Sequence, residues 1–368
     1  MRILVLAETY PMPNGKVTPM YIHMRNKYYM NKGEDVTVLN FRANSSAVYD
    51  GIQVITLKEY KKNYINEKFD VLISHASNIK HHYYFIKKFG KFFPKLMFVF
   101  HGHEVLRKST VYPTLYDWKK QKNKVMVSLR DFYDTYKLRI WKNFFENERV
   151  LRKTELVFVS HWMLDEFLKN TGTDYNIIKD HVHIIYNSIG RIFEQNEYCP
   201  NSPSYDFVTI RRNIDGEKYC VDVVNSLAKN NPEFKFLVVG KGELFDHIEK
   251  SENLEWRDTN LFHEEMLLVL NDSRIALMPT KTDAQGLMMC EMASYGIPVI
   301  TSDIPVCHEV LDDFENVAFV SNTGNDVLNP IVNDLIRRNN VSKRNRKFFE
   351  DNTSGKEWEL LRAMCAQQ

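Results

Sequence analysis

The strongest constraint on the fold of this 368-residue chain is a repeated alternation of short apolar runs with amphipathic stretches. Each run is too short for a buried helix and precedes a segment of helical or loop character, an order typical of a parallel sheet with helices on both faces. The runs lie at 2–8, 35–41, 52–57, 70–75, 96–102, 155–160 and 182–187, and then at 207–212, 234–242, 254–258, 274–280, 297–302 and 317–321. The sequence therefore predicts an α/β fold.

The alternation is interrupted once, and the interruption predicts two domains. Residues 188–206 are polar, contain Pro200 and Pro203, and show no hydrophobic period. We expect two Rossmann-like, doubly wound parallel-sheet domains facing each other across a crevice that holds the ligand. The predicted segments are a domain over 1–195, a linker over 196–205, a domain over 206–345 with helices near 218–229, 243–250, 262–271 and 286–295, and a C-terminal segment over 346–368.

Composition argues against several classes of protein. The 49 Lys and Arg residues nearly balance the 47 Asp and Glu residues, and the net charge of +2 argues against a nucleic-acid-binding protein that relies on net charge. The five cysteines include no C-x-x-C pair, so neither a disulfide framework nor a zinc cluster is indicated. The first residues lack the long apolar stretch of a signal peptide, and no later window is a membrane span. We expect a cytoplasmic protein.

One stretch, residues 107–153, is too long for an ordinary connection between strands of an α/β domain. It contains 13 basic and 5 acidic residues, with aromatic residues between them. A basic, aromatic helix of this kind can lie on an anionic membrane surface, which would make the protein peripheral on the inner face of the membrane. The alternative is a solvated helix whose aromatic side chains pack on the domain.

The densest signal for chemistry lies in residues 273–311. An apolar strand leads to a loop with Asp283, then to Gly286, and then to a helix whose first backbone N–H groups have no partner within the helix. These N–H groups and the positive end of the helix dipole favour a diphosphate. Glu291 lies further along the same helix, where a carboxylate can accept hydrogen bonds from ribose hydroxyls. Taken alone, the two acids fit a helix cap and a solvated helix residue better.

The string DAQGLMMCEMASYGIPVI, which starts at Asp283, resembles the E-x7-E signature of the retaining GT-B glycosyltransferases of glycosyltransferase family 4. The resemblance covers nearly the whole chain. In the family the first acid contacts the donor sugar and the second contacts the ribose, roles that fall on Asp283 and Glu291. Asp in place of Glu keeps the charge and shortens the side chain by one methylene. Gly286 and Leu287 match the family's Gly-Leu pair and would belong to the donor-binding site.

Further landmarks of the family occur in the same order. FVFHGHE resembles the family's strand that ends in His-Gly, which would make His101 the active-site histidine that contacts the donor sugar. FVTIRRNIDGEK resembles the opening of the second domain, where an Arg and a Lys bind the donor diphosphate. Lys218 matches the lysine, and Arg211 and Arg212 both remain candidates for the arginine. Two such cations neutralise a leaving diphosphate without a metal ion.

The resemblance also assigns several glycines and the end of the chain. FLVVGKGEL resembles the family's V-G-x-G-x strand and turn, so Gly240 and Gly242 would approach the nucleotide closely. Gly15 lies in NGKVTP, at the place of the family's glycine-rich loop after the first strand. Residues 346–368 would include the C-terminal helix that crosses back onto the first domain in GT-B folds.

The resemblance implies a metal-independent, hexosyltransferase-type enzyme that needs no cofactor, since the nucleotide sugar is its substrate. We expect a UDP-sugar as donor, a glycan or lipid-linked acceptor, and a role in the synthesis of cell-surface polysaccharide or glycoconjugate. No D-x-D string, which would hold a metal in another class of glycosyltransferase, occurs. Transfer would proceed by a same-face displacement in which the donor phosphate takes the acceptor proton.

Two other functions stay open. One is a non-catalytic partner subunit with the GT-B fold, suggested by Asp283 in the place of Glu. The other is a sugar-nucleotide 2-epimerase, which shares the fold but lacks the E-x7-E helix and the His-Gly pair. Fold alone does not decide function. Donor hydrolysis or sugar transfer by the purified chain would distinguish a glycosyltransferase from both alternatives.

Overall fold

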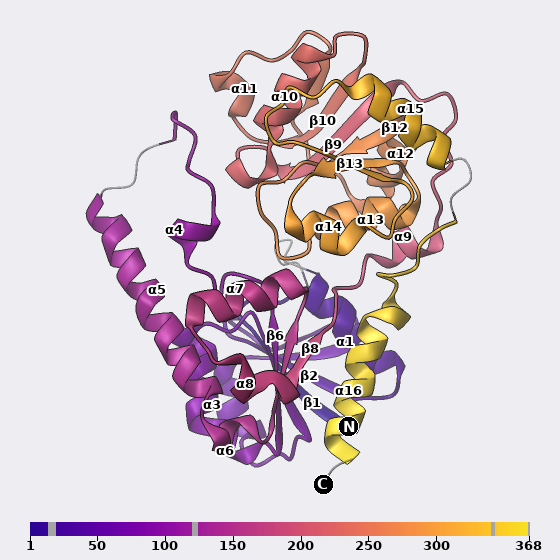
Figure 1. Ribbon diagram of the computed structural model, residues 1–368. Helices are drawn as coiled ribbons and strands as arrows, with labels where there is room; N and C mark the ends of the chain where they lie inside the picture. Colours follow the sequence, from indigo (N-terminus) through magenta and orange to yellow (C-terminus); the bar gives the residue numbers. More distant parts are fainter. Residues whose placement is uncertain (14–19, 120–123, 340–342, 367–368) are drawn as a thin grey trace. The chain divides into compact units, whose positions relative to one another are not determined.

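The computed structural model describes residues 1–13, 20–119, 124–339 and 343–366, and the chain divides into two compact units. Unit 1 contains residues 1–108, 128–188 and 350–368, and unit 2 contains residues 109–127 and 189–349. Each unit is built on its own sheet (Figure 1). The predicted α/β fold class with two parallel-sheet domains is therefore confirmed.

In the described residues, the sheet of unit 1 has the strand order β3-β4-β2-β1-β5-β6-β7-β8. Neighbouring strands run parallel except for β3 and β4, which form an antiparallel pair at one edge. The sequence did not predict β3, because three residues are too few to show a period. The strands are β1 (Arg2–Ala7), β2 (Asp35–Asn40), β3 (Ala47–Tyr49), β4 (Ile52–Ile55), β5 (Val71–His75), β6 (Lys95–Phe100), β7 (Thr154–Phe158) and β8 (Val182–Ile184).

Helices cover both faces of this sheet. In Figure 1, α1 and α16 lie on one side of the strands, and α3 and α5 lie on the other. The central strands β1 and β5 are accordingly buried along almost their whole length. The helices of this unit are α1 (Tyr21–Asn31), α2 (Leu57–Glu59), α3 (Tyr84–Phe89), α5 (Lys124–Phe145), α6 (Glu148–Leu151), α7 (His161–Thr171), α8 (Tyr175–Ile178) and α16 (Ser354–Ala366), with short π or 3-10 segments at Tyr60–Tyr64, Ile79–Tyr83, Gly90–Phe92, Lys179–His181 and Glu350–Asn352. The short helix α4 (Lys108–Val111) lies almost entirely in unit 2.

The sheet of unit 2 is parallel throughout the described residues and has the order β11-β10-β9-β12-β13-β14. Its strands are β9 (Tyr205–Asn213), β10 (Phe236–Lys241), β11 (Leu254–Arg257), β12 (Ser273–Leu277), β13 (Val299–Ser302) and β14 (Val317–Val320). Its helices are α9 (Arg191–Gln195), α10 (Val221–Asn230), α11 (Leu244–His247), α12 (His263–Asn271), α13 (Leu287–Tyr295), α14 (Pro305–Leu311) and α15 (Leu328–Asn339), with a 3-10 turn at Glu217–Tyr219. The four predicted helices of this domain correspond to α10, α11, α12 and α13.

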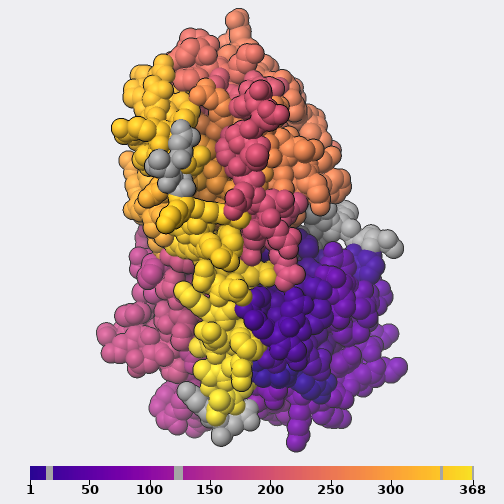
Figure 2. Space-filling model, turned by 90° about the vertical axis from the view of Figure 1, so that its right-hand side faces the viewer, coloured from indigo at the N-terminus to yellow at the C-terminus, as the bar shows by residue number. Residues whose placement is uncertain are grey.

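The chain passes between the units at positions that differ from the predicted boundaries. Residues 189–195, predicted in the first domain, belong to unit 2, because α9 packs against α13. Residues 346–349, predicted in the C-terminal segment, also belong to unit 2. Residues 350–366 lie on unit 1, and Figure 2 shows their helix, α16, in yellow beside the indigo N-terminal residues.

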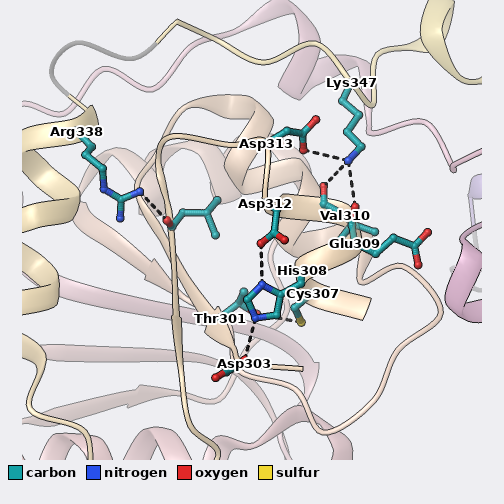
Figure 3. Close-up of polar contacts among 11 residues, drawn as sticks. Thr301, Asp303, Cys307, His308, Glu309, Val310, Asp312, Asp313, Arg338 and Lys347 are labelled. Atoms are coloured by element: carbon teal, nitrogen blue, oxygen red, sulfur yellow. Dashed lines mark hydrogen bonds and ion pairs between the residues drawn. The ribbon is translucent and has the colours of Figure 1, made fainter. Parts of the chain in front are cut away.

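Polar contacts around α14 explain why residues 346–349 stay with unit 2 (Figure 3). Lys347 Nζ donates to Asp313 Oδ1 at 3.0 Å and to two carbonyl oxygens near the end of α14 at 3.1 and 3.2 Å. In the same region the ring nitrogens of His308 lie 2.8 Å from Asp303 Oδ1 and 2.7 Å from Asp312 Oδ1. The bond to Asp303 is the main cause of a raised pKa at His308. The contacts of Lys347 hold residues 346–349 against the end of α14 and thereby keep them in unit 2.

The basic stretch 107–153 is not one helix. Residues 109–119 belong to unit 2, whereas most of α5 belongs to unit 1. Near the end of α5, Trp141 and Phe145 are buried against other aromatic rings, including Phe98. Earlier in α5, four apolar side chains at helical spacing are exposed: Leu129 (63%), Phe132 (74%), Tyr133 (46%) and Tyr136 (49%). Packing on the domain therefore accounts for the aromatic residues of only part of this stretch.

Among the described residues, no helix is both long enough and apolar enough to cross a bilayer.

Candidate functional site

The predicted site residues of unit 2 converge at the carboxyl edge of its sheet. Arg211 and Arg212 lie near the end of β9, and the loop after β12 contains Asp283 and leads into α13. β9 and β12 are hydrogen-bonded neighbours in a parallel sheet. Their following segments therefore meet at one edge, which is the usual place for ligands in such sheets.

Arg211 and Arg212, which the sequence left as alternatives, have different environments. Successive side chains of a strand point to opposite faces, and here Arg211 is buried while Arg212 is exposed. One terminal nitrogen of Arg211 donates to the carbonyl of Pro279 at 2.7 Å, and its Nε has no partner among the described residues. Burial lowers the pKa of Arg211, and the carboxylate of Asp283 opposes this shift. The structure thus groups Arg211, rather than Arg212, with Asp283.

Lys218 joins the same cluster. Its Nζ lies 3.3 Å from Asp283 Oδ2, and both side chains are partly buried. The Tyr219 ring lies against both cations, 4.8 Å from Lys218 Nζ and 5.0 Å from the guanidinium carbon of Arg211. The Lys218 carbonyl accepts hydrogen bonds from the Thr280 hydroxyl and the Lys281 amide, which fix its loop to the loop after β12. Two cations and one carboxylate are held together in this way.

The start of α13 lies in the chain just after this cluster. Gly286 has φ +70° at the N-cap, a left-handed conformation that side chains rarely adopt. A Cβ atom there would also come within 2.4 Å of the Met289 side chain. The following residue, Leu287, opens the helix and is partly exposed. The first turn of α13 therefore offers backbone N–H groups that suit an anion.

Glu291 lies in the second turn of α13 and is largely shielded from water. Its Oε1 accepts a hydrogen bond from the Gly190 amide at 3.3 Å. Burial raises the pKa of Glu291 to about 7, and the Gly190 amide opposes this rise only in part. A carboxylate that gives up its proton near pH 7 and has few partners is suited to accept hydrogen bonds from hydroxyl groups.

Gly240 and Gly242 are needed first for the packing of the loops themselves. A Cβ on Gly240 would come within 2.0 Å of the Arg211 carbonyl, and one on Gly242 within 2.4 Å of Asp215 Oδ1. The close approach that requires these glycines is therefore to the end of β9 and the loop after it. Gly242 also lines a surface hollow of about 370 Å³ with Arg212, Asn213, Asp215, Tyr219, Lys241 and Asn260.

The loop of Lys218 is clamped by residues 116–119, which belong to the basic stretch 107–153 that the sequence analysis linked to a membrane surface. Lys119 Nζ lies 2.7 Å from Glu217 Oε1 and also donates to the carbonyl of Asp215. The Tyr116 hydroxyl donates to Asp222 Oδ1 at 2.9 Å, and Trp118 stacks on the His247 ring. The basic and aromatic composition of 107–153 gave no signal that separates these residues from those of α5.

In unit 1 the predicted site residue is His101, which directly follows β6. Its Nε2 lies 3.2 Å from Nδ1 of His75, the last residue of the neighbouring strand β5. The His101 ring also lies 4.3 Å from the ring of Tyr21. The His101 amide donates to the buried carboxylate of Glu104, which fixes the turn after β6. His75 was not among the predicted site residues, although its place at the end of a predicted strand was a signal. Gly15 lies outside the described residues.

A family model described as Glycosyl transferases group 1 matches residues 207–335. This range contains most of β9, the loop of Lys218, Asp283 and α13, and thus the whole cluster at the edge of the second sheet.

Two curated proteins are similar over part of their length. An "Uncharacterized 41.2 kDa protein in cps region" of Klebsiella pneumoniae is 22% identical over 280 residues, which cover 71% of this chain and 66% of that protein. The O-antigen chain mannosyltransferase RfbU of Salmonella typhimurium is 25% identical over 197 residues, which cover 50% of this chain and 52% of that protein. The matches thus span less than two thirds of the length of either relative.

Solved structures share the fold over the full chain. Sucrose-phosphate synthase from Thermosynechococcus elongatus superposes with a TM-score of 0.71 at 12% identity, covering 100% of both chains. Anabaena Alr3699/HepE, solved in complex with UDP, superposes with a TM-score of 0.63 at 13% identity, covering 99% of this chain and 100% of that one. These likenesses agree with the GT-B fold.

Proposed function

We propose that this chain is a retaining glycosyltransferase that moves a sugar from a nucleotide sugar to a glycan or lipid-linked acceptor. The observation that carries the proposal is the cluster of Arg211, Lys218 and Asp283 close to the start of α13, inside the range matched by the family model. Two cations and a helix N-terminus suit a diphosphate, and a neighbouring carboxylate suits the hydroxyls of a sugar.

The proposed reaction forms one bond and breaks one bond. The acceptor hydroxyl oxygen bonds to the anomeric carbon on the face from which the diphosphate leaves, and the bond between that carbon and the phosphate oxygen breaks. The acceptor proton passes to an oxygen of the departing phosphate. Arg211 and Lys218 stabilise the negative charge that develops on the diphosphate, and preorganised charges of this kind contribute strongly to catalysis. In this proposal Asp283 orients the sugar, Glu291 holds the ribose, and His101 contacts the sugar.

The names of the similar proteins support the substrate class. One relative is named from a cps region and another as an O-antigen chain mannosyltransferase, while HepE was solved with UDP. We therefore propose a UDP-sugar donor and a role in cell-surface polysaccharide synthesis, with a mannose donor as the first competitor to test.

A panel of nucleotide sugars tests this function. The full chain is incubated with each donor, nucleotide release is followed by mass spectrometry, and binding is followed by the ligand-induced shift in melting temperature. We expect one donor to bind and to be hydrolysed slowly without acceptor. Binding without turnover on any acceptor extract would favour a non-catalytic subunit, and release of a 2-epimeric sugar would favour an epimerase. Failure of every donor to bind would overturn the proposal.

Turnover is expected to persist in EDTA. Arg211, Lys218 and the start of α13 supply the positive charge that a metal ion supplies in other transferases. Among the described residues, no group of three or more His, Cys, Asp or Glu side chains is arranged to hold a metal ion. The measurement is the rate of nucleotide release before and after chelation. Loss of activity that Mg²⁺ or Mn²⁺ restores would contradict metal independence.

Glu291→Gln is expected to stabilise the protein at pH 8 while weakening its binding of UDP. The pKa of Glu291 is raised from 4.5 in the unfolded chain to about 7 in the folded protein. The associated stability is complete below pH 4.5 and is lost as pH rises through 7, because the partly buried carboxylate must then ionise. Gln avoids this loss, so Tm rises by a few degrees at pH 8 and changes little near pH 4.5.

The same substitution replaces a ribose acceptor with a group that is partly a donor, which should weaken UDP binding about 10-fold. Calorimetry at pH 8 measures the Kd. Glu252→Gln, at an exposed position of the same unit, is the matched control and should change neither quantity. An unchanged UDP affinity in Glu291→Gln would remove Glu291 from the site.

The exposed stripe of α5 is proposed to hold the protein on an anionic membrane. The stripe consists of Leu129, Phe132, Tyr133 and Tyr136, with Arg139 exposed one turn further along. Apolar side chains beside basic ones favour such a surface, and each basic residue near it contributes about 1 kcal/mol. We expect co-sedimentation with vesicles that contain anionic lipid at low salt, and release at high salt.

Leu129→Ser/Phe132→Ser should abolish this sedimentation. The matched control is Phe262→Ser/Leu268→Ser, which removes two equally exposed apolar side chains from unit 2 (73% and 71% exposed). Equal loss in both double variants, or no lipid-dependent pelleting of the unmodified protein, would rule out α5 as a docking surface. The transferase proposal does not depend on this result.

A further inference from the structure

Two histidines meet at the carboxyl edge of the first sheet. His75 ends β5, and His101 follows the adjacent strand β6, with His75 in register with Val99. His75 is buried, with 1% of its surface exposed, whereas His101 is partly exposed. Their ring nitrogens, Nδ1 of His75 and Nε2 of His101, lie 3.2 Å apart, which is within hydrogen-bond range.

Both rings are neutral at physiological pH. Burial is the main cause of a pKa well below 6.5 at each histidine, and the buried guanidinium of Arg25 lowers both further. A neutral imidazole has one N–H and one bare nitrogen. The contact between the rings therefore contains a single proton, and one histidine donates while the other accepts.

The direction of this bond follows from the other nitrogen of His75. His75 Nε2 is buried and has no hydrogen-bond partner in the described part of the chain. A buried N–H without an acceptor is rarer in proteins than a buried acceptor without a donor. Nε2 is accordingly the bare nitrogen of His75, and Nδ1 carries its proton. His75 then donates to His101 Nε2, and the proton of His101 must be on Nδ1.

We propose that His75 is a positioning residue that fixes the tautomer of His101, so that His101 offers Nδ1–H as a hydrogen-bond donor to an oxygen of the donor substrate. The inference rests on the proposed function for the identity of that substrate. Apart from the contact with His75, the His101 ring makes no hydrogen bond with the described residues 1–13, 20–119, 124–339 and 343–366, so Nδ1–H is its remaining donor. In this tautomer His101 holds the sugar by donating a proton in a hydrogen bond and does not act as a base.

Magnetic resonance tests the tautomer without any substrate. The full chain is labelled with ¹⁵N at histidine, and long-range ¹H–¹⁵N correlations distinguish a protonated ring nitrogen from a bare one. The His101 signals are identified by their loss in His101→Asn. We expect Nδ1 of both histidines to be protonated and Nε2 of both to be bare. A protonated Nε2 on His101 in the unmodified protein would overturn the proposal.

Two substitutions of His75 connect the tautomer to function. His75→Asn keeps an amide donor near the place of Nδ1, whereas His75→Leu removes the donor. We expect His75→Leu to shift the proton of His101 to Nε2 and to lower donor turnover about 10-fold, and His75→Asn to retain both. His183→Leu, which removes a half-buried histidine paired with Glu155 in the same unit, is the matched control and should leave the His101 signals unchanged.

The outcomes separate this inference from the proposed function. If no nucleotide sugar is turned over, the spectra of the unmodified protein still decide the tautomer. If the spectra show the expected tautomer but His75→Leu turns over its donor at the normal rate, the hydrogen bond exists and His75 has no positioning role. If His75→Leu does not fold, the tautomer of His101 is decided by the spectra of the unmodified protein and of His75→Asn.

Discussion

Lys218→Ala is expected to lower kcat for sugar transfer by about 10²-fold or more, with a smaller effect on the KM for the donor. The ammonium group of Lys218 is held beside Asp283 and Tyr219, close to the start of α13. A cation in this position gains most when the diphosphate takes on charge as it leaves, so its loss raises the barrier more than it weakens substrate binding. Steady-state kinetics with the donor found in the panel measures both constants.

The matched control for Lys218→Ala is Lys229→Ala. Lys229 belongs to the same unit and forms an ion pair with Glu249 at 3.0 Å, but both of these side chains are exposed. Exposed pairs contribute little, so this variant should behave as the unmodified protein. Near-normal kcat in Lys218→Ala would show that Lys218 is an ordinary surface cation and would leave Arg211 as the remaining candidate.

The fold could be predicted from the sequence because it depends on local patterns. Every strand of the second sheet was predicted from an apolar run between polar segments, and so were four of the five helices between these strands; α14 was not predicted. The edge strand β3 was not predicted, because it is three residues long and pairs antiparallel to β4. The boundaries were less accurate, because residues such as Lys347 are assigned to a unit by contacts distant in sequence.

Sequence motifs predicted only part of the candidate site. The string from Asp283 to Glu291 located α13 and the carboxylates. It did not distinguish Arg211 from Arg212, because the choice depends on which face of β9 is covered. The hydrogen bond between His75 and His101 depends on strand order, which joins residues 26 positions apart.

The basic stretch 107–153 shows why composition alone was insufficient. Its aromatic residues have three environments: buried in unit 1 (Trp141), exposed on α5 (Phe132) and packed on unit 2 (Trp118). All three are flanked by the same kinds of basic residue. Only the tertiary contacts separate a core position from a docking surface and from the clamp on the Lys218 loop.

Glu357→Ala is expected to be the most destabilising of the substitutions considered, by about 3–5 kcal/mol. Glu357 lies on α16 and has no exposed surface. Its carboxylate accepts from Arg25 Nε at 2.8 Å and from the Tyr29 hydroxyl, both on α1. Alanine would remove the carboxylate that pairs with the buried guanidinium of Arg25 and with the Tyr29 hydroxyl; Asn187 Oδ1, a neutral acceptor 2.6 Å from Arg25, does not balance the charge, and uncompensated buried charge is costly. Thermal unfolding should show Tm lower by about 10 °C.

A double-mutant cycle separates loss of the pair from loss of packing. Arg25→Met/Glu357→Leu replaces both charges with apolar side chains and should recover much of the stability lost in Glu357→Ala, because the cost arises from the unpaired charge. Glu359→Ala, at an exposed position of α16, is the control and should leave Tm unchanged. If Glu357→Ala has the same Tm as the unmodified protein, the buried pair is not a principal source of stability. The apolar residues of α16, such as Leu361, then hold this helix on unit 1.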